Sequence, residues 1–337
     1  CLPAQPYCLG NRPSRRSTLA RQSQPAADAG YITIISGLET QSMHSTNFDN
    51  FFSGGAGLHL MRAVRDSLTE DGPDLTSNAV FSANHALHAI IVAKEDTLLA
   101  GLPIIPLVLE ESAHLEPGDW SYTYHATEGA FLPAGTTVAS LHGSARILLR
   151  AERIILNFIC HLSGIANLTR AYVKALEGTD VRLLDTRKTL PGLRYPEKYA
   201  VLVGGGVNHR KNLSELLMLK DNHIDAAGGI SQAVAALRKA YAPVPPIEVE
   251  CRTLEEVAEA VACDVSRIML DNMSAEKMRE ALNMTPASIE VEISGGVTLE
   301  NSGKLARSGA DRKADFISVG RLSHSAPAAD FSMRISR

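Results

Sequence analysis

The second half of the chain alternates between short apolar stretches and longer stretches of helical periodicity. Six apolar stretches have the length of buried strands: VRLLD (181–185), ELLMLK (215–220), IEVE (247–250), RIML (267–270), SIEVEIS (288–294) and DFISVG (315–320). Between the later ones, apolar positions recur at helical spacing over 253–262, 274–282 and 298–309. Repeated strand–helix units predict a parallel sheet, and their number fits a closed or nearly closed barrel.

The first half has a different pattern. Residues 58–69 have helical periodicity, and residues 78–143 contain short strand candidates separated by glycine, proline and other turn residues. A long helical pattern begins at residue 146, with Gly164 as a candidate break. We therefore expect an N-terminal α+β domain over 56–150, followed by the barrel domain over 151–324. A C-terminal tail, 325–337, could pack on the first domain.

Residues 1–55 differ from both domains. The segment before Asp28 contains four arginines and no acidic residue, and it is rich in serine and proline. Such a composition is typical of a transit peptide or of a disordered tail. We expect a disordered extension that ends in a flexible joint at 51–59.

Composition narrows the class of protein. The 337 residues are 45% apolar and 21% charged, which is ordinary for a globular protein. A formal net charge of -4 and a pI near 6.3 argue against nucleic-acid binding. The apolar run at 98–109 is too short to span a bilayer, and the five cysteines include no C-x-x-C pair. We expect a cytoplasmic protein with reduced thiols that binds neither membrane nor nucleic acid.

Positive charge is concentrated at 181–223, where eight lysines and arginines stand against four acids in an otherwise acidic chain. Polar residues also follow each predicted strand, and the carboxyl ends of barrel strands carry active sites. Arginine binds carboxylate or phosphate through a planar fork, whereas lysine acts as a point charge. The pattern predicts a polyanion site built from the following cations: Arg187, Lys188, His209, Arg210 and Lys220.

The next strands end in acids and in small residues. Glu250 and Asp271 could hold a divalent metal, hydroxyl groups or a positive charge that develops in a transition state. Of the two acids in IEVE, we expect only Glu250 to face the site. The stretches SGG (294–296) and SVGRLSHS (318–325) could bind a phosphate through backbone N–H groups.

These motifs together resemble the quinolinate phosphoribosyltransferases, which are type II phosphoribosyltransferases. The resemblance covers roughly 56–332 and is carried by TRKT, PGLR, EKYAV, GGG, NHR, KDNH, MLDN and ISGGVTLEN in the family's order. It implies an N-terminal α/β sandwich, an incomplete α/β barrel and a homodimer. It also implies a reaction of NAD biosynthesis, in which quinolinate and 5-phosphoribosyl 1-pyrophosphate form nicotinate mononucleotide, pyrophosphate and CO₂ with Mg²⁺ as cofactor.

The resemblance assigns a role to each site residue. Lys188 and Lys220 would act in catalysis together with Glu250 and Asp271, and the two acids would lie near the ribose and the Mg²⁺. Substrate-binding positions, which hold the two carboxylates of quinolinate, the pyrophosphate and the phosphate, would be Arg153, Arg187, Lys188, His209, Arg210, Lys220, Ser294, Gly295, Gly320 and His324. Arg153 matches the arginine that relatives contribute across the dimer interface.

The residues leave alternatives open. A Schiff-base aldolase on the same barrel would use Lys188 or Lys220 as nucleophile and would need that lysine in a dry pocket. A non-catalytic sensor would bind the same anions without turnover, and a sister transferase would accept another aromatic acid. The segment at 309–318 also looks a few residues longer than is usual in the family, which could shift the loop at Gly320.

Overall fold

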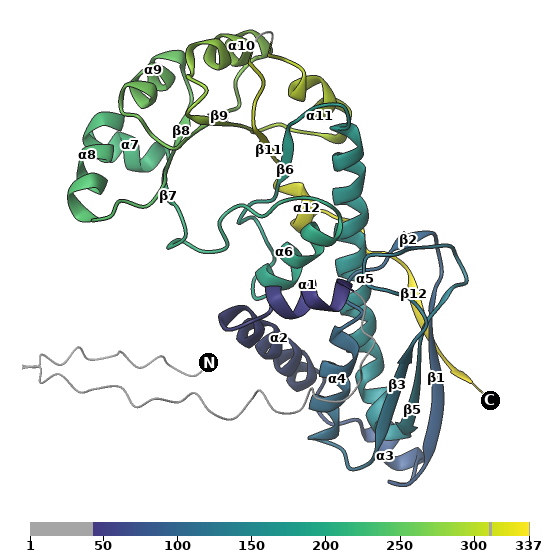
Figure 1. Ribbon diagram of the computed structural model, residues 1–337. Coiled ribbons are helices and arrows are strands. Elements are labelled where there is room, and N and C mark those ends of the chain that lie inside the picture. The colour runs from purple at the N-terminus through teal and green to yellow at the C-terminus, as the bar shows by residue number, and fades with distance from the viewer. Residues whose placement is uncertain (1–42, 310–311, 337) are drawn as a thin grey trace, which may run out of the picture. The chain divides into compact units, whose positions relative to one another are not determined.

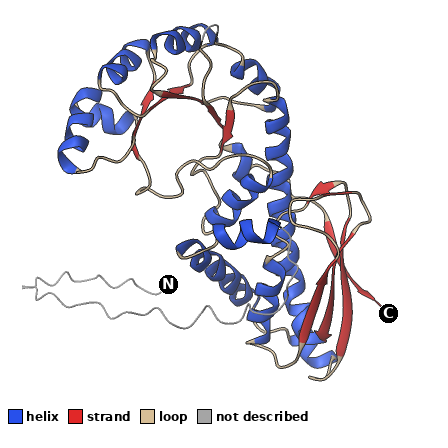
Figure 2. Cartoon of the chain, viewed as in Figure 1, coloured by secondary structure: helices blue, strands red, loops and turns tan. Residues whose placement is uncertain are grey.

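The computed structural model describes residues 43–309 and 312–336 (Figure 1). The expected disorder of residues 1–42 therefore lies outside the described residues, as do two residues of the longer segment at 309–318. From α5 onward strands are separated by helices, and the strands of the described residues form three sheets (Figure 2). One larger sheet is antiparallel and the other is parallel.

The antiparallel sheet has the order β12-β1-β5-β3. Its strands are β1 (Ala86–Ala93), β3 (Trp120–Tyr124), β5 (Thr137–Ser144) and β12 (Phe331–Ser336), and the two-stranded sheet consists of β2 (Thr97–Leu98) and β4 (Phe131–Leu132). The C-terminal segment joins this first domain, because β12 pairs with β1 and places Arg334 opposite Ile90. The helices of this half are α1 (Met43–Phe51), α2 (Gly55–Asp71), α3 (Leu75–Val80) and α4 (Ile104–Ala113).

Two expectations for this half are wrong. The extension does not continue to residue 55, because α1 is part of the fold: Phe48 and Phe52 are buried, with ring centroids 5.2 and 5.3 Å from that of Tyr199. The run at 104–113, expected among short strands, is the helix α4. Pro106 lies in its first turn, where a backbone N–H has no partner within the helix, so the proline costs no hydrogen bond.

Helix α5 (Ala145–Ala175) runs without interruption across the expected domain boundary at 150. Gly164 is not a break. A Cβ there would collide with the carbonyl oxygen of Pro327, so glycine allows the C-terminal segment to cross the helix. The backbone N–H of Ala329 then donates to the carbonyl of Cys160 (2.9 Å). By length and composition α5 could cross a membrane, but 61% of its most apolar window is buried inside the fold, as in a core helix.

The parallel sheet has the order β6-β11-β10-β9-β8-β7. Its strands match the six predicted stretches: β6 (Arg182–Leu184), β7 (Leu217–Leu219), β8 (Ile247–Cys251), β9 (Arg267–Asp271), β10 (Glu290–Ser294) and β11 (Phe316–Ser318). The helices of this half are α6 (Arg194–Val203), α7 (Asp221–Ala227), α8 (Ile230–Ala240), α9 (Leu254–Ala262), α10 (Ala275–Met284), α11 (Leu299–Ala306) and α12 (Arg321–His324). Helices α8, α9 and α10 lie on the outer side of the curved sheet (Figure 1).

The barrel is incomplete, because β6 and β7 are the two edges of the sheet and do not pair with each other. Val207 forms an isolated parallel bridge with Leu184, beside β6. The chain then runs from Val207 to β7 at the opposite edge. We call residues 207–216 the closing segment, because it joins the two open edges of the barrel.

Candidate active site

The carboxyl ends of the parallel strands bring most of the predicted residues to one edge of the sheet. Asp271, the last residue of β9, pairs in register with Ser294, the last residue of β10. Glu250 lies near the end of β8, next in the sheet, and Lys220 directly follows β7. Neighbouring parallel strands therefore present a lysine, two carboxylates and a hydroxyl to the same space.

Several of these side chains are in contact. Nζ of Lys220 lies 2.7 Å from Oε2 of Glu250, and the Lys220 side chain is 46% exposed. The hydroxyl of Ser318 donates to that of Ser294 (3.0 Å). Lys188 lies against Gly320, since a Cβ at 320 would be 2.9 Å from Cδ of Lys188. Both lysines proposed for catalysis are exposed, so neither lies in the dry pocket that an aldolase would need.

Gly295 is required by the loop that follows β10. Its φ of +83° lies in the left-handed region, and the carboxamide of Asn272 occupies the space that a Cβ would fill. The same carboxamide donates to Asp271 (2.9 Å), and the Asn272 N–H donates to the Ser294 carbonyl (3.0 Å). The loops after β9 and β10 therefore fit against each other and fix the position of Asp271.

Arg187 and Arg210 form a half-buried pair of like charges. Burial and the neighbouring Arg187 lower the pKa of Arg210, while Glu248 acts in the opposite direction. Nε of Arg187 is buried and has no hydrogen-bond partner among the described residues. Nη1 of Arg210 donates to the carbonyl of Leu216 (3.0 Å), and Arg210 lines a cavity of about 240 Å³ beside the closing segment. An anion between the two guanidinium groups would relieve their repulsion.

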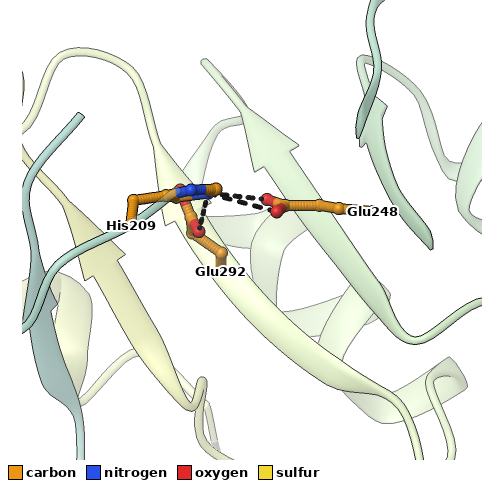
Figure 3. Close-up of side chains that lie close together, drawn as sticks. All are labelled: His209, Glu248 and Glu292. Atoms are coloured by element: carbon orange, nitrogen blue, oxygen red, sulfur yellow. Dashed lines mark hydrogen bonds and ion pairs between the residues drawn. The ribbon is translucent and has the colours of Figure 1, made fainter. Parts of the chain in front are cut away.

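His209 does not face the open end of the barrel as expected for an anion ligand. It is 7% exposed, and Nε2 lies 3.1 Å from Glu248 and 3.4 Å from Glu292 (Figure 3). Burial lowers the pKa of His209, but the hydrogen bonds to Glu248 and Glu292 outweigh it and raise the pKa to about 9. The N–H of Arg210 points at Nδ1 from 2.7 Å, which opposes a proton there and works against that rise. With Nδ1 accepting from Arg210, Nε2–H donates to Glu248, and Glu292 lies 3.4 Å away.

The carboxylates of Glu248 and Glu292 were missed by the sequence reasoning. Both residues are fully buried, and Arg267 approaches them at 3.8 and 3.7 Å. The expectation that Glu250 alone faces inward was wrong, because residues two apart in a strand share a face. Glu248 therefore lies on the same inner face as Glu250, one step deeper. The signal was present in IEVE and EVE, where an acid occurs at every second position.

A second buried pair holds the main chain of the closing segment. Nζ of Lys198 lies 2.5 Å from Asp185, and it also donates to the carbonyl of His209 (3.0 Å). Asp185 accepts the N–H of His209 (2.7 Å) and the side-chain amide of Asn208 (2.8 Å). Burial raises the pKa of Asp185 and lowers the pKa of Lys198, and the attraction between the two charges opposes both shifts. Sequence reasoning gave Lys198 no defined role.

Two predicted residues lie apart from this cluster. Arg153 is exposed on α5 and lines a different cavity of about 390 Å³, together with Arg150 and the segment 71–76. His324 is exposed and its Nδ1 lies 2.8 Å from the hydroxyl of Ser325. Within residues 43–309 and 312–336, neither forms a hydrogen bond or ion pair with the cation pair or the carboxylates, so their predicted roles need a movement or a second chain.

Comparison with known proteins gives consistent matches over both domains. The model of the quinolinate phosphoribosyl transferase N-terminal domain matches residues 74–163, and that of the C-terminal domain matches residues 165–334. A probable nicotinate-nucleotide pyrophosphorylase [carboxylating] of Bacillus subtilis is 41% identical over 263 residues, 78% of this chain and 88% of the relative. A Homo sapiens nicotinate-nucleotide pyrophosphorylase [carboxylating] is 36% identical over 281 residues, 82% of this chain and 91% of the relative.

A solved structure agrees with these matches. The crystal structure of NadC from Streptococcus pyogenes superposes with a TM-score of 0.74 at 39% identity, covering 82% of this chain and 96% of that chain.

Proposed function

The chain belongs to the quinolinate phosphoribosyltransferase family, and we propose that the carboxyl edge of its incomplete barrel is where the family's reaction takes place. The enzyme transfers the phosphoribosyl group of 5-phosphoribosyl 1-pyrophosphate to quinolinate in NAD biosynthesis. A bond forms between the ring nitrogen and C1 of the ribose as pyrophosphate leaves. The carboxyl group at C2 departs as CO₂, its bonding electrons stay on the ring, and a proton replaces it to give nicotinate mononucleotide.

The observation that carries the proposed anion site is the half-buried pair Arg187 and Arg210, between the loop that follows β6 and the start of β7. Their charges repel each other, and Nε of Arg187 is buried without a partner among residues 43–309 and 312–336. Such an arrangement is costly unless an anion binds between the two groups. We assign the carboxylates of quinolinate to this pair. Lys188 and Lys220 would bind the pyrophosphate, since both are exposed at the same edge of the sheet.

The loops after β10 and β11 suit the 5-phosphate of the cosubstrate. Ser294 and Gly295 lie in the first loop and Gly320 in the second, and small residues let a phosphate approach the backbone N–H groups. The hydrogen bond between Ser318 and Ser294 joins the two loops. His324 would reach this phosphate only by leaving Ser325.

Glu250 and Asp271 would face the ribose. Their half-buried carboxylates could stabilise positive charge that develops at C1 as pyrophosphate leaves. Lys220 now neutralises Glu250, so we expect the lysine to turn to the pyrophosphate when the cosubstrate binds. Oxygen donors at a partly open site also suit Mg²⁺, which keeps several waters, and the ion would neutralise charge on the leaving pyrophosphate.

The assembly we propose is a homodimer in which Arg153 serves the partner's site. Arg153 is exposed on α5 and lines a different cavity from the Arg210 of its own chain. A two-fold axis would place the same patch of each chain at the other's site. Mixing Arg153→Ala chains with Lys220→Ala chains tests this. Shared sites predict that heterodimers regain about half of wild-type activity, because one of the two sites is complete. No recovery despite demonstrated subunit exchange would refute the assignment.

The function itself is tested by turnover. We expect protein incubated with carboxyl-labelled quinolinate, 5-phosphoribosyl 1-pyrophosphate and Mg²⁺ to release labelled CO₂ and to form nicotinate mononucleotide. Nicotinate or another aromatic acid in place of quinolinate serves as the comparison. Turnover with one of these acids but not with quinolinate would identify a sister transferase instead.

A further inference from the structure

A buried cluster of charged residues inside the barrel includes one side chain that does not come from a strand. His209 lies in the closing segment, and its ring enters the barrel interior between Glu248 of β8 and Glu292 of β10 (Figure 3). The two acids are not on adjacent strands, because β9 lies between them. The ring therefore enters from the open side of the barrel and lies near acids on two strands that have a third strand between them.

Two buried carboxylates, Glu248 and Glu292, share two basic groups. These are the His209 ring and the guanidinium of Arg267, which enters from β9 and also pairs with Glu290. His209, Glu248 and Glu292 place their ligand atoms within 4.8 Å of one another, close enough to surround a metal ion. Arg267 already supplies the compensating charge from 3.7 and 3.8 Å, and a divalent cation there would be repelled. The cluster is therefore an ion-pair anchor.

Both the side chain and the backbone of His209 have polar partners. Its ring donates to Glu248 and lies 3.4 Å from Glu292, its backbone N–H donates to Asp185 (2.7 Å), and its carbonyl accepts from Lys198 (3.0 Å). The next residue is Arg210, whose N–H contacts Nδ1 of the ring (2.7 Å). A shift of the ring would therefore move the backbone of Arg210.

We infer that Glu248 and Glu292 are positioning residues, which clamp the His209 ring inside the barrel and thereby hold Arg210 in place for quinolinate. This inference rests on the proposed function in one respect, the assignment of Arg210 to quinolinate. Neither acid contacts the substrate. Their loss should affect binding of the acceptor and leave the cosubstrate contacts at Lys188, Lys220 and the phosphate loops unchanged.

The matched control is Glu290. It lies on β10 two residues before Glu292 and binds the same Arg267 at 2.7 Å, but its side chain is 44% exposed and does not pair with His209. Glu248→Gln and Glu292→Gln keep the side-chain volume and remove the charge. We expect each to raise KM for quinolinate about tenfold, as when a charge-assisted contact is weakened. We expect kcat and KM for 5-phosphoribosyl 1-pyrophosphate to change less than about threefold, and Glu290→Gln to match wild type.

Loss of a buried charge can also unfold the barrel, so a second pair of variants changes His209 and leaves both acids in place. In His209→Gln the side-chain amide can still donate to the acids, whereas His209→Ala cannot. We expect His209→Gln to bind quinolinate several-fold more tightly than His209→Ala. Equal affinities would overturn the inference, as would equal rises of KM for both substrates in the Glu248 and Glu292 variants.

The clamp on His209 and the assignment of Arg210 to quinolinate can be refuted by different results. A histidine NMR spectrum of the ligand-free enzyme reports the His209 ring without any substrate. If Glu248→Gln and Glu292→Gln shift the His209 signal while Arg210→Ala leaves quinolinate affinity unchanged, the anchor exists and the assignment of Arg210 is wrong. If the His209 signal is the same in wild type and both variants, the clamp itself is refuted.

Discussion

Replacing Arg210 by alanine should weaken quinolinate binding without unfolding the protein. A charge-assisted hydrogen bond contributes about 1.5–3 kcal/mol, which corresponds to roughly 10- to 150-fold in affinity. Arg210 is only half-buried, so solvent screening favours the lower part of that range. We therefore expect a loss of about 10- to 30-fold, measured by calorimetric titration with quinolinate.

The fold should tolerate this change because, in the part of the chain that the structure describes, the Arg210 side chain makes one hydrogen bond, to the carbonyl of Leu216. Its loss should lower the free energy of unfolding by about 1 kcal/mol. Lys211→Ala is the control, since Lys211 is the next residue and its Nζ lies 4.0 Å from Glu215. We expect its quinolinate affinity to change less than about twofold. Equal losses in the two variants would mean that quinolinate responds to the general positive field and not to Arg210.

Three further outcomes are expected. Glu250→Gln and Asp271→Asn should each lower turnover by about 100-fold or more while quinolinate still binds, and full turnover in one of them would remove that residue from the mechanism. Gly164→Ala should lower the free energy of unfolding by about 1–3 kcal/mol because the methyl group meets the backbone of the C-terminal segment, whereas Gly55→Ala, with nothing within 4 Å, should not. Chelation of divalent cations should stop turnover and added Mg²⁺ should restore it; steady turnover in the chelator would exclude the ion.

The parallel sheet could be predicted because its strands are buried on both faces and end in polar loops. Each of the six apolar stretches became a strand, and the family and fold expected from the motifs are confirmed. The same reasoning failed at 104–113, since a short apolar run does not distinguish a buried strand from a buried helix. It also failed at α1, where Phe48 and Phe52 follow a tail of disordered composition and become buried only by packing on Tyr199.

The residue types of the site could be predicted from the sequence, but their arrangement in space could not. Positions at strand ends, such as Glu250, Asp271 and Ser294, follow from the strands themselves, because parallel strands bring their carboxyl ends to one edge. The place of Arg153 does not follow from the strands, because Arg153 lies on α5 and lines a different cavity.

The charge pairing inside the barrel could not be predicted from local sequence patterns alone. The period of two in IEVE and EVE puts Glu248 and Glu292 on the inner face, and a buried acid needs a cation. The sequence does not show which cation pairs with these buried acids, because the stretch at 181–223 contains many basic residues. Arg267 of β9 supplies one cation from the sheet itself, and the second basic group comes from the segment that crosses the opening between β6 and β7. The residue that enters from this segment is His209, whose ring lies between the two acids and which directly precedes Arg210 in the chain.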